Sequence, residues 1–337
     1  NEYGRVDRVA GWFLLARMYL NAQTWINENK YQEAYTYATK VIADGHYPLA
    51  SDYREIFLAD NNTCKEIIWP LVQDGLRAQS SAGTNFYVKA FVNGPMDELY
   101  KTGVGSRGWG NVRAKVSLVD AFDADDVMFD GNDTWGNNKK DKRAQFMTAL
   151  PNQVKDTWDV NMDMTSTFTC GYGYIKWRNV TKEDELSASG DAYTSIDFPL
   201  FRTADAYLMA AEAILRGASG TKSEALGYVN EVRTRAYMSG KYAKSGVRSD
   251  VSGEIGANEL DLDFLLLERQ KELASELIRR TDLIRFGKYT KGNNWDWKNG
   301  VRLGEDVDDK YNLFPIPESE LTNNPTLVQN DGYKVIK

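Results

Sequence analysis

The stretch from 102 to 113, TGVGSRGWGNVR, places a tryptophan among closely spaced glycines. Glycine at this density is typical of irregular backbone at the protein surface, whereas a tryptophan side chain usually covers a large apolar contact area. Trp109 is therefore a candidate for contact with a ligand. The alternative is that its indole anchors the loop to the core, and the local sequence is compatible with both interpretations.

Other kinds of site have less support in the residue types. His46 is the only histidine, which disfavours clusters of imidazole ligands for zinc and a nucleophile paired with histidine. Its surroundings, ADGHYPL, are typical of the turn after a helix. A carboxylate pair like that of a glycosidase would be invisible among 48 acidic residues, so this chemistry is not excluded.

The composition limits the classes of partner that the protein can bind. With 42% hydrophobic and 26% charged residues among 337, the sequence is typical of a globular protein of one large or two ordinary domains. The formal net charge of −7 disfavours binding to nucleic acid or to an anionic membrane, which leaves sugars or proteins as partners. No apolar run approaches the roughly 20 residues that span a bilayer, and the first residues lack the pattern of a signal peptide.

Two further features leave alternatives open. Cys64 and Cys170 either form a disulfide or stay free, and their spacing does not decide between the two. The acidic run 120–133 does not fit an EF-hand, because Met128 occupies a ligand position and Asn137 stands where a bidentate glutamate is required. We expect a solvated loop there and no cofactor, with an irregular structural Ca²⁺ site as the alternative.

Helical periodicity dominates the start of the chain. Apolar residues recur at intervals of three and four in 8–22 and 31–44, and Gly45 is placed to end the second helix. This pair keeps the spacing of the first half of a tetratricopeptide repeat, at Trp12, Leu15, Ala16, Tyr19, Ala34 and Pro48. The small side chains at 16 and 34 allow the two helices to approach closely.

More helices are predicted toward the end of the chain. Segments 200–217 and 223–240 form a second helix pair, and 259–289 has the pattern of one long helix that ends at Gly287. Its charges favour salt bridges between helices over catalysis, and those interpreted as structural are Glu268, Glu272, Arg279, Asp282 and Arg285. Between the helical blocks, 70–198 is mostly loop, and 66–72 and 84–92 are predicted as small strands.

Three segments together resemble one family. The helix pair 200–237, the Glu- and Arg-rich segment 268–289 and the tail NLFPIPESELTNNPTLVQNDGY at 312–333 are similar, in this order, to the SusD/RagB-type glycan-binding lipoproteins. The helical opening, 4–22 through 53–61, is similar to the starch-utilisation type within this family. The resemblance covers nearly the whole chain.

The resemblance implies a mainly α fold of tetratricopeptide-like helix pairs in one curved layer, covered by irregular loops and small β elements. We expect one domain over 1–337, with a helix pair in 1–69, a loop-rich region facing the ligand in 70–198, and C-terminal helices with the PIP tail in 199–337. Family members are longer, so we expect that the N-terminal part of the family fold, with its lipidated cysteine, is missing. The chain is then a fragment, a cleaved chain or a short relative.

The resemblance also implies a function. Such proteins bind oligosaccharide or polysaccharide without catalysis, on the outer membrane facing outward, and deliver it to a SusC-like TonB-dependent transporter. Starch or another α-glucan is the expected ligand. A surface glycoside hydrolase, with Asp97 and Glu98 as its nearest carboxylates, is one alternative. A helical-repeat scaffold that binds only protein is another, and it predicts that Trp109 is dispensable.

The resemblance assigns Trp109 to an arc of aromatic side chains that follows the glucan. One pyranose face presents C–H groups that pack on an aromatic ring, and the hydroxyls need donors and acceptors around it. The remaining candidates are Arg107, Asn111, Tyr100, Phe86 and Tyr87. A second arc tyrosine of the starch-type protein has no counterpart, because Ser80 and Ser81 stand there. We interpret Trp295 and Trp297 as loop anchors.

Overall fold

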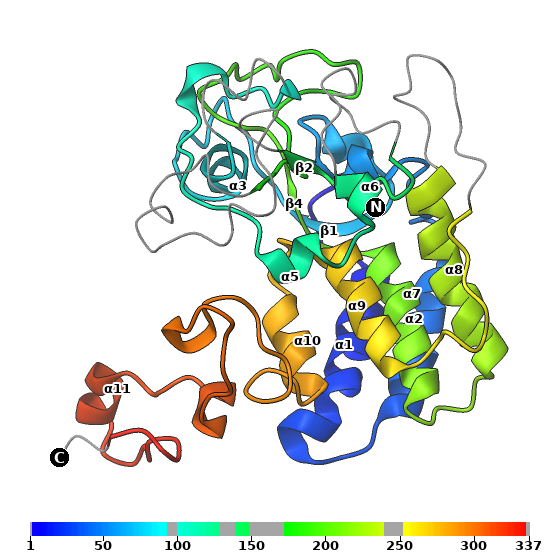
Figure 1. Ribbon diagram of the computed structural model, residues 1–337, viewed down its shortest axis with the longest axis vertical. Helices are drawn as coiled ribbons and strands as arrows, with labels where there is room; N and C mark the ends of the chain where they lie inside the picture. Colours follow the sequence, from blue (N-terminus) through cyan, green and yellow to red (C-terminus); the bar gives the residue numbers. More distant parts are fainter. Residues whose placement is uncertain (1, 93–99, 128–138, 148–171, 239–251, 335–337) are drawn as a thin grey trace. The chain divides into compact units, whose positions relative to one another are not determined.

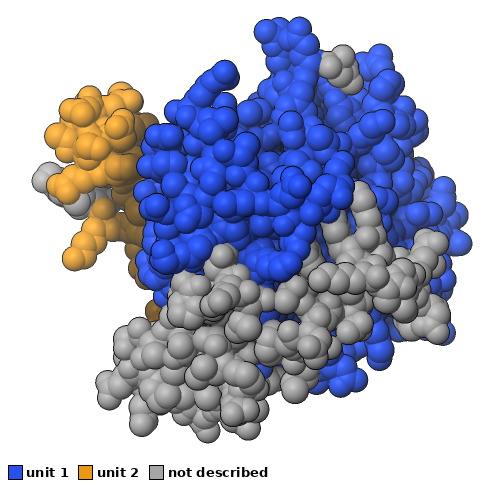
Figure 2. All heavy atoms as spheres, turned by 90° about the horizontal axis from the view of Figure 1, so that it is seen from above, with its two compact units in different colours: residues 1–276 blue, residues 277–337 orange. Residues whose placement is uncertain are grey.

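A computed structural model describes residues 2–92, 100–127, 139–147, 172–238 and 252–334. The chain divides into two compact units, residues 1–276 and 277–337, which Figure 2 colours separately. In the described residues, the first unit contains a layer of helices and two small antiparallel sheets. The second unit contains the short helices α10 (Arg279–Arg285) and α11 (Glu318–Asn323) joined by loops.

The helical layer is the largest part of the first unit (Figure 1). It consists of α1 (Arg8–Ile26), α2 (Tyr31–Asp44), α7 (Thr203–Leu215), α8 (Lys222–Met238) and α9 (Leu262–Leu273). Helix α2 packs between α1 and α7, and α7 also contacts α8 and α9. The mainly helical fold and both predicted helix pairs are therefore confirmed.

The first helix pair forms for the reasons that its sequence indicates. Asp7 caps α1 by accepting a hydrogen bond of 2.8 Å from the backbone N–H of Ala10, and α2 ends at Gly45 with a φ of 77°. Ala16 and Ala34 are fully buried in the core that α1, α2 and α7 share. Small side chains at these two positions allow the close approach of the helices.

The strands are short. β1 (Ile67–Leu71) pairs antiparallel with β4 (Phe198–Arg202), and Ile67 lies opposite Arg202. The predicted strand at 66–72 is thus confirmed. β2 (Phe146–Met147) pairs with β3 (Gly173–Tyr174). Short helices complete this part of the first unit, namely α3 (Thr84–Ala90), α5 (Val116–Val119) and α6 (Ala124–Val127).

Two predictions about elements are wrong. Segment 84–92 contains helix α3 instead of a strand, because Thr84 and Val88, one helical turn apart, are both buried, and this packing outweighs the β-propensity of the aromatic residues. The segment 259–289 is not one helix. It breaks after α9, where Ser275 and Leu277 have φ values of 58° and 62° in the left-handed region, and helix resumes only at α10.

The charged residues of α9 belong to a buried network. Arg202 contacts Glu66 at 2.9 Å and Glu272 at 2.6 Å, and Arg143 contacts Glu268 at 2.6 Å. Burial alone would raise the pKa of Glu272, but the neighbouring guanidinium groups hold it well below its usual range. The prediction of a structural role is confirmed for Glu268 and Glu272, whose arginine partners come from other elements.

The two tryptophans in the loop after α10 have different surroundings. The Trp295 ring packs on Tyr289 with 5.8 Å between centroids, and the Lys298 ammonium lies 4.8 Å from the centre of the same ring. Trp297 is half-buried and adopts a left-handed φ of 65°. These contacts favour the interpretation of Trp295 as a loop anchor. Within α10, Asp282 and Arg285 pair at 2.7 Å, in line with their predicted structural role.

Several sequence features lie partly or fully outside the described residues. Cys64 is a buried free thiol, and burial raises its pKa to about 12, but Cys170 is outside the described part of the chain. Met128 and Asn137, the two positions that disfavour an EF-hand, also lie outside the described residues. Among the helices that are described, none combines the length and apolar character needed to cross a membrane.

Candidate functional site

The loop that contains Trp109 is fixed to the C-terminal end of helix α3. The backbone N–H of Trp109 donates to the carbonyl of Lys89 at 2.7 Å, and the N–H of Asn111 donates to the carbonyl of Ala90 at 2.8 Å. These are the last carbonyls of α3, which have no partner within the helix. The helix end therefore positions the indole.

Glycine is required for the path of this loop. Gly103 and Gly110 have φ values of 77° and 60°, in the region that side chains rarely adopt. A Cβ atom at Gly103 would also lie 2.5 Å from the carbonyl oxygen of Asn179, too close for any contact. The glycines noted in the sequence thus set the backbone path beside Trp109.

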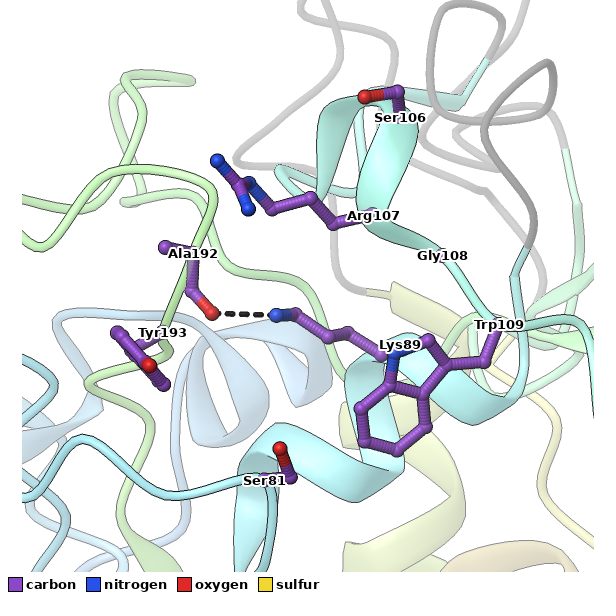
Figure 3. A pocket seen from close by; sticks show the side chains of 8 residues that line it. All are labelled: Ser81, Lys89, Ser106, Arg107, Gly108, Trp109, Ala192 and Tyr193. Atoms are coloured by element: carbon purple, nitrogen blue, oxygen red, sulfur yellow. Dashed lines mark hydrogen bonds between the residues drawn. The ribbon is translucent and has the colours of Figure 1, made fainter.

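Trp109 borders a surface pocket of about 330 Å³ (Figure 3). This volume is within the range of about 300–1,000 Å³ that is typical of small-molecule sites. Its lining combines one indole, one phenol ring and several polar groups. The residues are Ser81, Lys89, Ser106, Arg107, Gly108, Trp109, Ala192 and Tyr193. Trp109 is 37% exposed, so much of its ring is accessible to a ligand.

Lys89 reaches from α3 into the space between the two aromatic side chains (Figure 3). Its ammonium lies 5.9 Å from the centre of the Trp109 ring and 5.6 Å from that of Tyr193, and it donates a hydrogen bond to the carbonyl of Ala192. Burial lowers the pKa of this ammonium, and the nearby Arg107 guanidinium lowers it further. The Asp191 carboxylate acts in the opposite direction, but the net pKa is lowered.

Arg107 forms another edge of the pocket. Its Nε lies 3.0 Å from Oδ1 of Asp191, and both side chains are substantially exposed. Ala192 and Tyr193 follow Asp191 in a loop held by serine hydroxyls, since Ser189 donates to the Tyr193 carbonyl at 2.7 Å. Residues 192–193 therefore meet at this pocket with residues 81, 89 and 106–109, from which they are far apart in sequence.

The structure brings together some of the predicted site residues. Trp109 and Arg107 line the pocket. Phe86 is 43% exposed, and its ring lies 6.1 Å from that of Trp109, so it extends the aromatic surface beside the pocket. Ser81, first noted as the place where an aromatic residue is lacking, also lines it.

Three predicted residues lie elsewhere. Tyr100 is 2% exposed in the core, so its ring is not available to a ligand, and its assignment to the site is wrong. Tyr87 is half-buried and packs against Trp177 and Phe198 at centroid distances of 5.4 and 5.7 Å. Asn111 is exposed outside the pocket lining, and its backbone N–H caps α3.

Lys89 and Tyr193 were not identified from the sequence. Lys89 is the only charged residue in the run NFYVKAFV, and this isolated charge could have indicated a site residue. The assignment of that run to a strand hid its relation to Trp109, because only a helix places Lys89 at the end that binds the loop. Tyr193 gave no local signal, since its position depends on contacts between distant segments.

Metal sites have no support in the described residues. That part of the chain contains no group of three or more His, Cys, Asp or Glu side chains arranged to bind a metal ion. His46 follows α2, is exposed and lies 2.5 Å from Asp44, as expected for a turn residue. Asp97 and Glu98, the carboxylates of the glycosidase alternative, lie outside the described residues.

Comparison with known proteins identifies the family. The sequence model of the SusD family matches residues 65–333. The chain belongs to the SusD family. Among curated relatives, the starch-binding protein SusD of Bacteroides thetaiotaomicron is 33% identical, over 98% of this chain and 61% of the relative. The SusD-like protein P25 of Formosa agariphila is 25% identical, over 98% of this chain and 59% of the relative. The chain thus spans about three fifths of the length of these relatives.

Solved structures agree with this assignment of the SusD fold. A SusD-like protein from Bacteroides fragilis superposes with a TM-score of 0.66 at 22% identity, covering 98% of this chain and 66% of that one. Surface glycan-binding protein A from Bacteroides thetaiotaomicron, in complex with laminarihexaose, gives a TM-score of 0.62 at 21% identity, with coverages of 98% and 65%. At these identities the similarity concerns the fold alone.

Proposed function

We propose that this chain of the SusD family binds a glycan without cleaving it, and that the sugar stacks on Trp109 in the pocket. The observation that supports the proposal best is an accessible indole beside clustered polar side chains, on a backbone held by a helix end. A sugar ring offers C–H groups to the indole and hydroxyls to Ser81, Lys89 and Arg107.

The proposed mechanism is capture followed by delivery. Binding at an open pocket is weak, in the range of about micromolar to millimolar, because little area is buried against the cost of immobilising the sugar. Display of many copies on a cell surface would compensate through avidity. We propose that the whole protein is lipid-anchored on the outer membrane and delivers the glycan to a SusC-like TonB-dependent transporter. Starch or another α-glucan, as predicted from the sequence, is the first ligand to test.

Affinity electrophoresis tests the proposal directly. The chain is run through gels that contain amylopectin, other plant and host glycans, or no polymer. We expect retardation by at least one polymer and no release of reducing ends. Trp109→Ala should weaken that retardation by about tenfold, because it removes the apolar stacking surface.

Trp25→Ala is the matched control. Trp25 is 56% exposed on helix α1 and is not part of the pocket, so the loss of its indole should leave retardation unchanged. Retardation that persists in Trp109→Ala would exclude this pocket as the site. Release of reducing ends would favour the glycosidase alternative, and absence of retardation with every polymer would contradict sugar binding by this chain.

A further inference from the structure

The charges around the pocket are unbalanced. Its lining contains two cationic side chains, Lys89 and Arg107, and no carboxylate. The Arg107 guanidinium is matched by Asp191 at 3.0 Å. Among the described residues, no carboxylate lies within salt-bridge distance of Lys89, whose hydrogen-bond acceptor is the uncharged carbonyl of Ala192. In this part of the chain, Lys89 is therefore the pocket cation without a salt bridge of its own, and Asp191, which pairs with Arg107, offsets its charge only in part.

Lys89 is built into the site and is not a mobile surface lysine. The residue is 7% exposed, and its ammonium lies between the Trp109 and Tyr193 rings. An ammonium has three donors, so two N–H groups remain after the bond to Ala192. Burial and the neighbouring Arg107 both lower the pKa of Lys89, and the Asp191 carboxylate opposes them only in part. The net pKa stays lowered, and a ligand anion beside the ammonium would offset the rest.

We propose that the sugar unit bound in this pocket carries a carboxylate, as a hexuronate does. The carboxylate accepts hydrogen bonds from Lys89 and from the free N–H groups of Arg107, while the ring stacks on Trp109. Charge-assisted bonds of this kind are about twice as strong as neutral ones. The inference rests on the proposed glycan binding and narrows it to an acidic glycan, for which a neutral α-glucan is the weaker ligand.

Isothermal titration calorimetry with two matched ligands tests the inference. Trigalacturonate and its fully methyl-esterified form share the sugar backbone and differ in charge. We expect the acid to bind on the order of tenfold more tightly, because the ester cannot form the charge-assisted hydrogen bonds with Lys89 and Arg107. The preference should shrink as salt is raised.

Three variants locate the effect. Lys89→Met should remove most of the preference for the acid, and Lys89→Arg should retain it because the positive charge remains. Lys65→Met removes an exposed lysine outside the pocket and should leave the preference unchanged, which controls for net charge. Should Lys89→Met not fold, the exposed Arg107→Met replaces it, with a smaller preference for the acid as the expected result.

The possible outcomes separate this inference from the proposed function. Equal affinities for acid and ester, or tighter binding of maltohexaose than of trigalacturonate, would overturn the acidic ligand and leave glycan binding intact. Binding of a sulfated galactan oligosaccharide in preference to trigalacturonate, lost in Lys89→Met, would replace the carboxylate by a sulfate ester. No binding of any sugar would overturn both.

Discussion

Two groups of cations in this chain have opposite surroundings. In the buried network, Arg202 and Arg235 each contact both Glu66 and Glu272, so positive and negative charges alternate out of water. In the pocket, the Lys89 ammonium has the carbonyl of Ala192 and two aromatic rings as neighbours, and the nearest ion pair is that of Arg107 with Asp191. An unpaired charge with little exposure to water is costly, and a ligand carboxylate beside Lys89 would offset that cost.

Glu272 is the residue on which the buried network depends most. Its carboxylate contacts Arg143, Arg202 and Arg235. Glu272→Gln keeps the size of the side chain but leaves three guanidinium groups short of one negative charge. We expect the free energy of unfolding to fall by about 3 kcal/mol, as for other buried ion pairs that lose one partner. Urea denaturation followed by circular dichroism measures this change.

The control for this variant is Glu183→Gln, since Glu183 is exposed and its side chain has no ion pair among those described. Its unfolding free energy should stay within about 0.5 kcal/mol of the parent. A loss in Glu272→Gln no larger than in Glu183→Gln would mean that the network adds nothing to stability. The structural role of Glu272 would then be wrong.

At the scale of elements, the close contact of α1 and α2 is a testable feature. Ala16 is fully buried in the core shared with α2 and α7. Ala16→Leu adds three carbons where no space is left, so we expect a loss of about 1–3 kcal/mol from overpacking. Thermal denaturation measures it. Met18→Leu, on the exposed side of the same helix, should change the melting temperature little, and equal melting of both variants would contradict close packing at Ala16.

The same elements show how far the sequence alone could predict the structure. Periodicity predicted α1, α2, α7 and α8, because the apolar residues that recur at helical spacing are the ones that pack against neighbouring helices, although α7 is buried on nearly all sides. It failed at α3, where a short run rich in β-prone residues becomes helical through tertiary packing. Glycine spacing was enough to predict an irregular backbone around Trp109. It could not predict Tyr193, which reaches the pocket from a segment more than 80 residues away.

At the scale of the first unit, one carboxylate joins three helices. Asp205 on α7 lies 2.8 Å from Arg17 of α1 and 2.8 Å from Arg269 of α9. Burial by itself would raise the pKa of Asp205, but the two guanidinium groups lower it from 3.8 to about 2. The helical layer is thus stabilised by a charge that acid can remove.

The sign of the pH dependence follows from this shift. Because the folded-state pKa is depressed, the unfolded chain takes up the proton first, and stability that is present above pH 4 is lost as the pH falls from about 4 to about 2. The shift corresponds to about 2 kcal/mol from Asp205 alone. The pKa values of Asp126 and Asp197 are raised in the folded state, so protonation of these two groups stabilises the fold. This opposite effect occurs at pH values above the window in which Asp205 takes up its proton. Urea titrations at intervals between pH 5 and pH 2 should show a steep decline below pH 4 in the parent. Asp205→Asn, already less stable at pH 7, should show a shallower one, and parallel declines would contradict the assignment of this charge to the acid response.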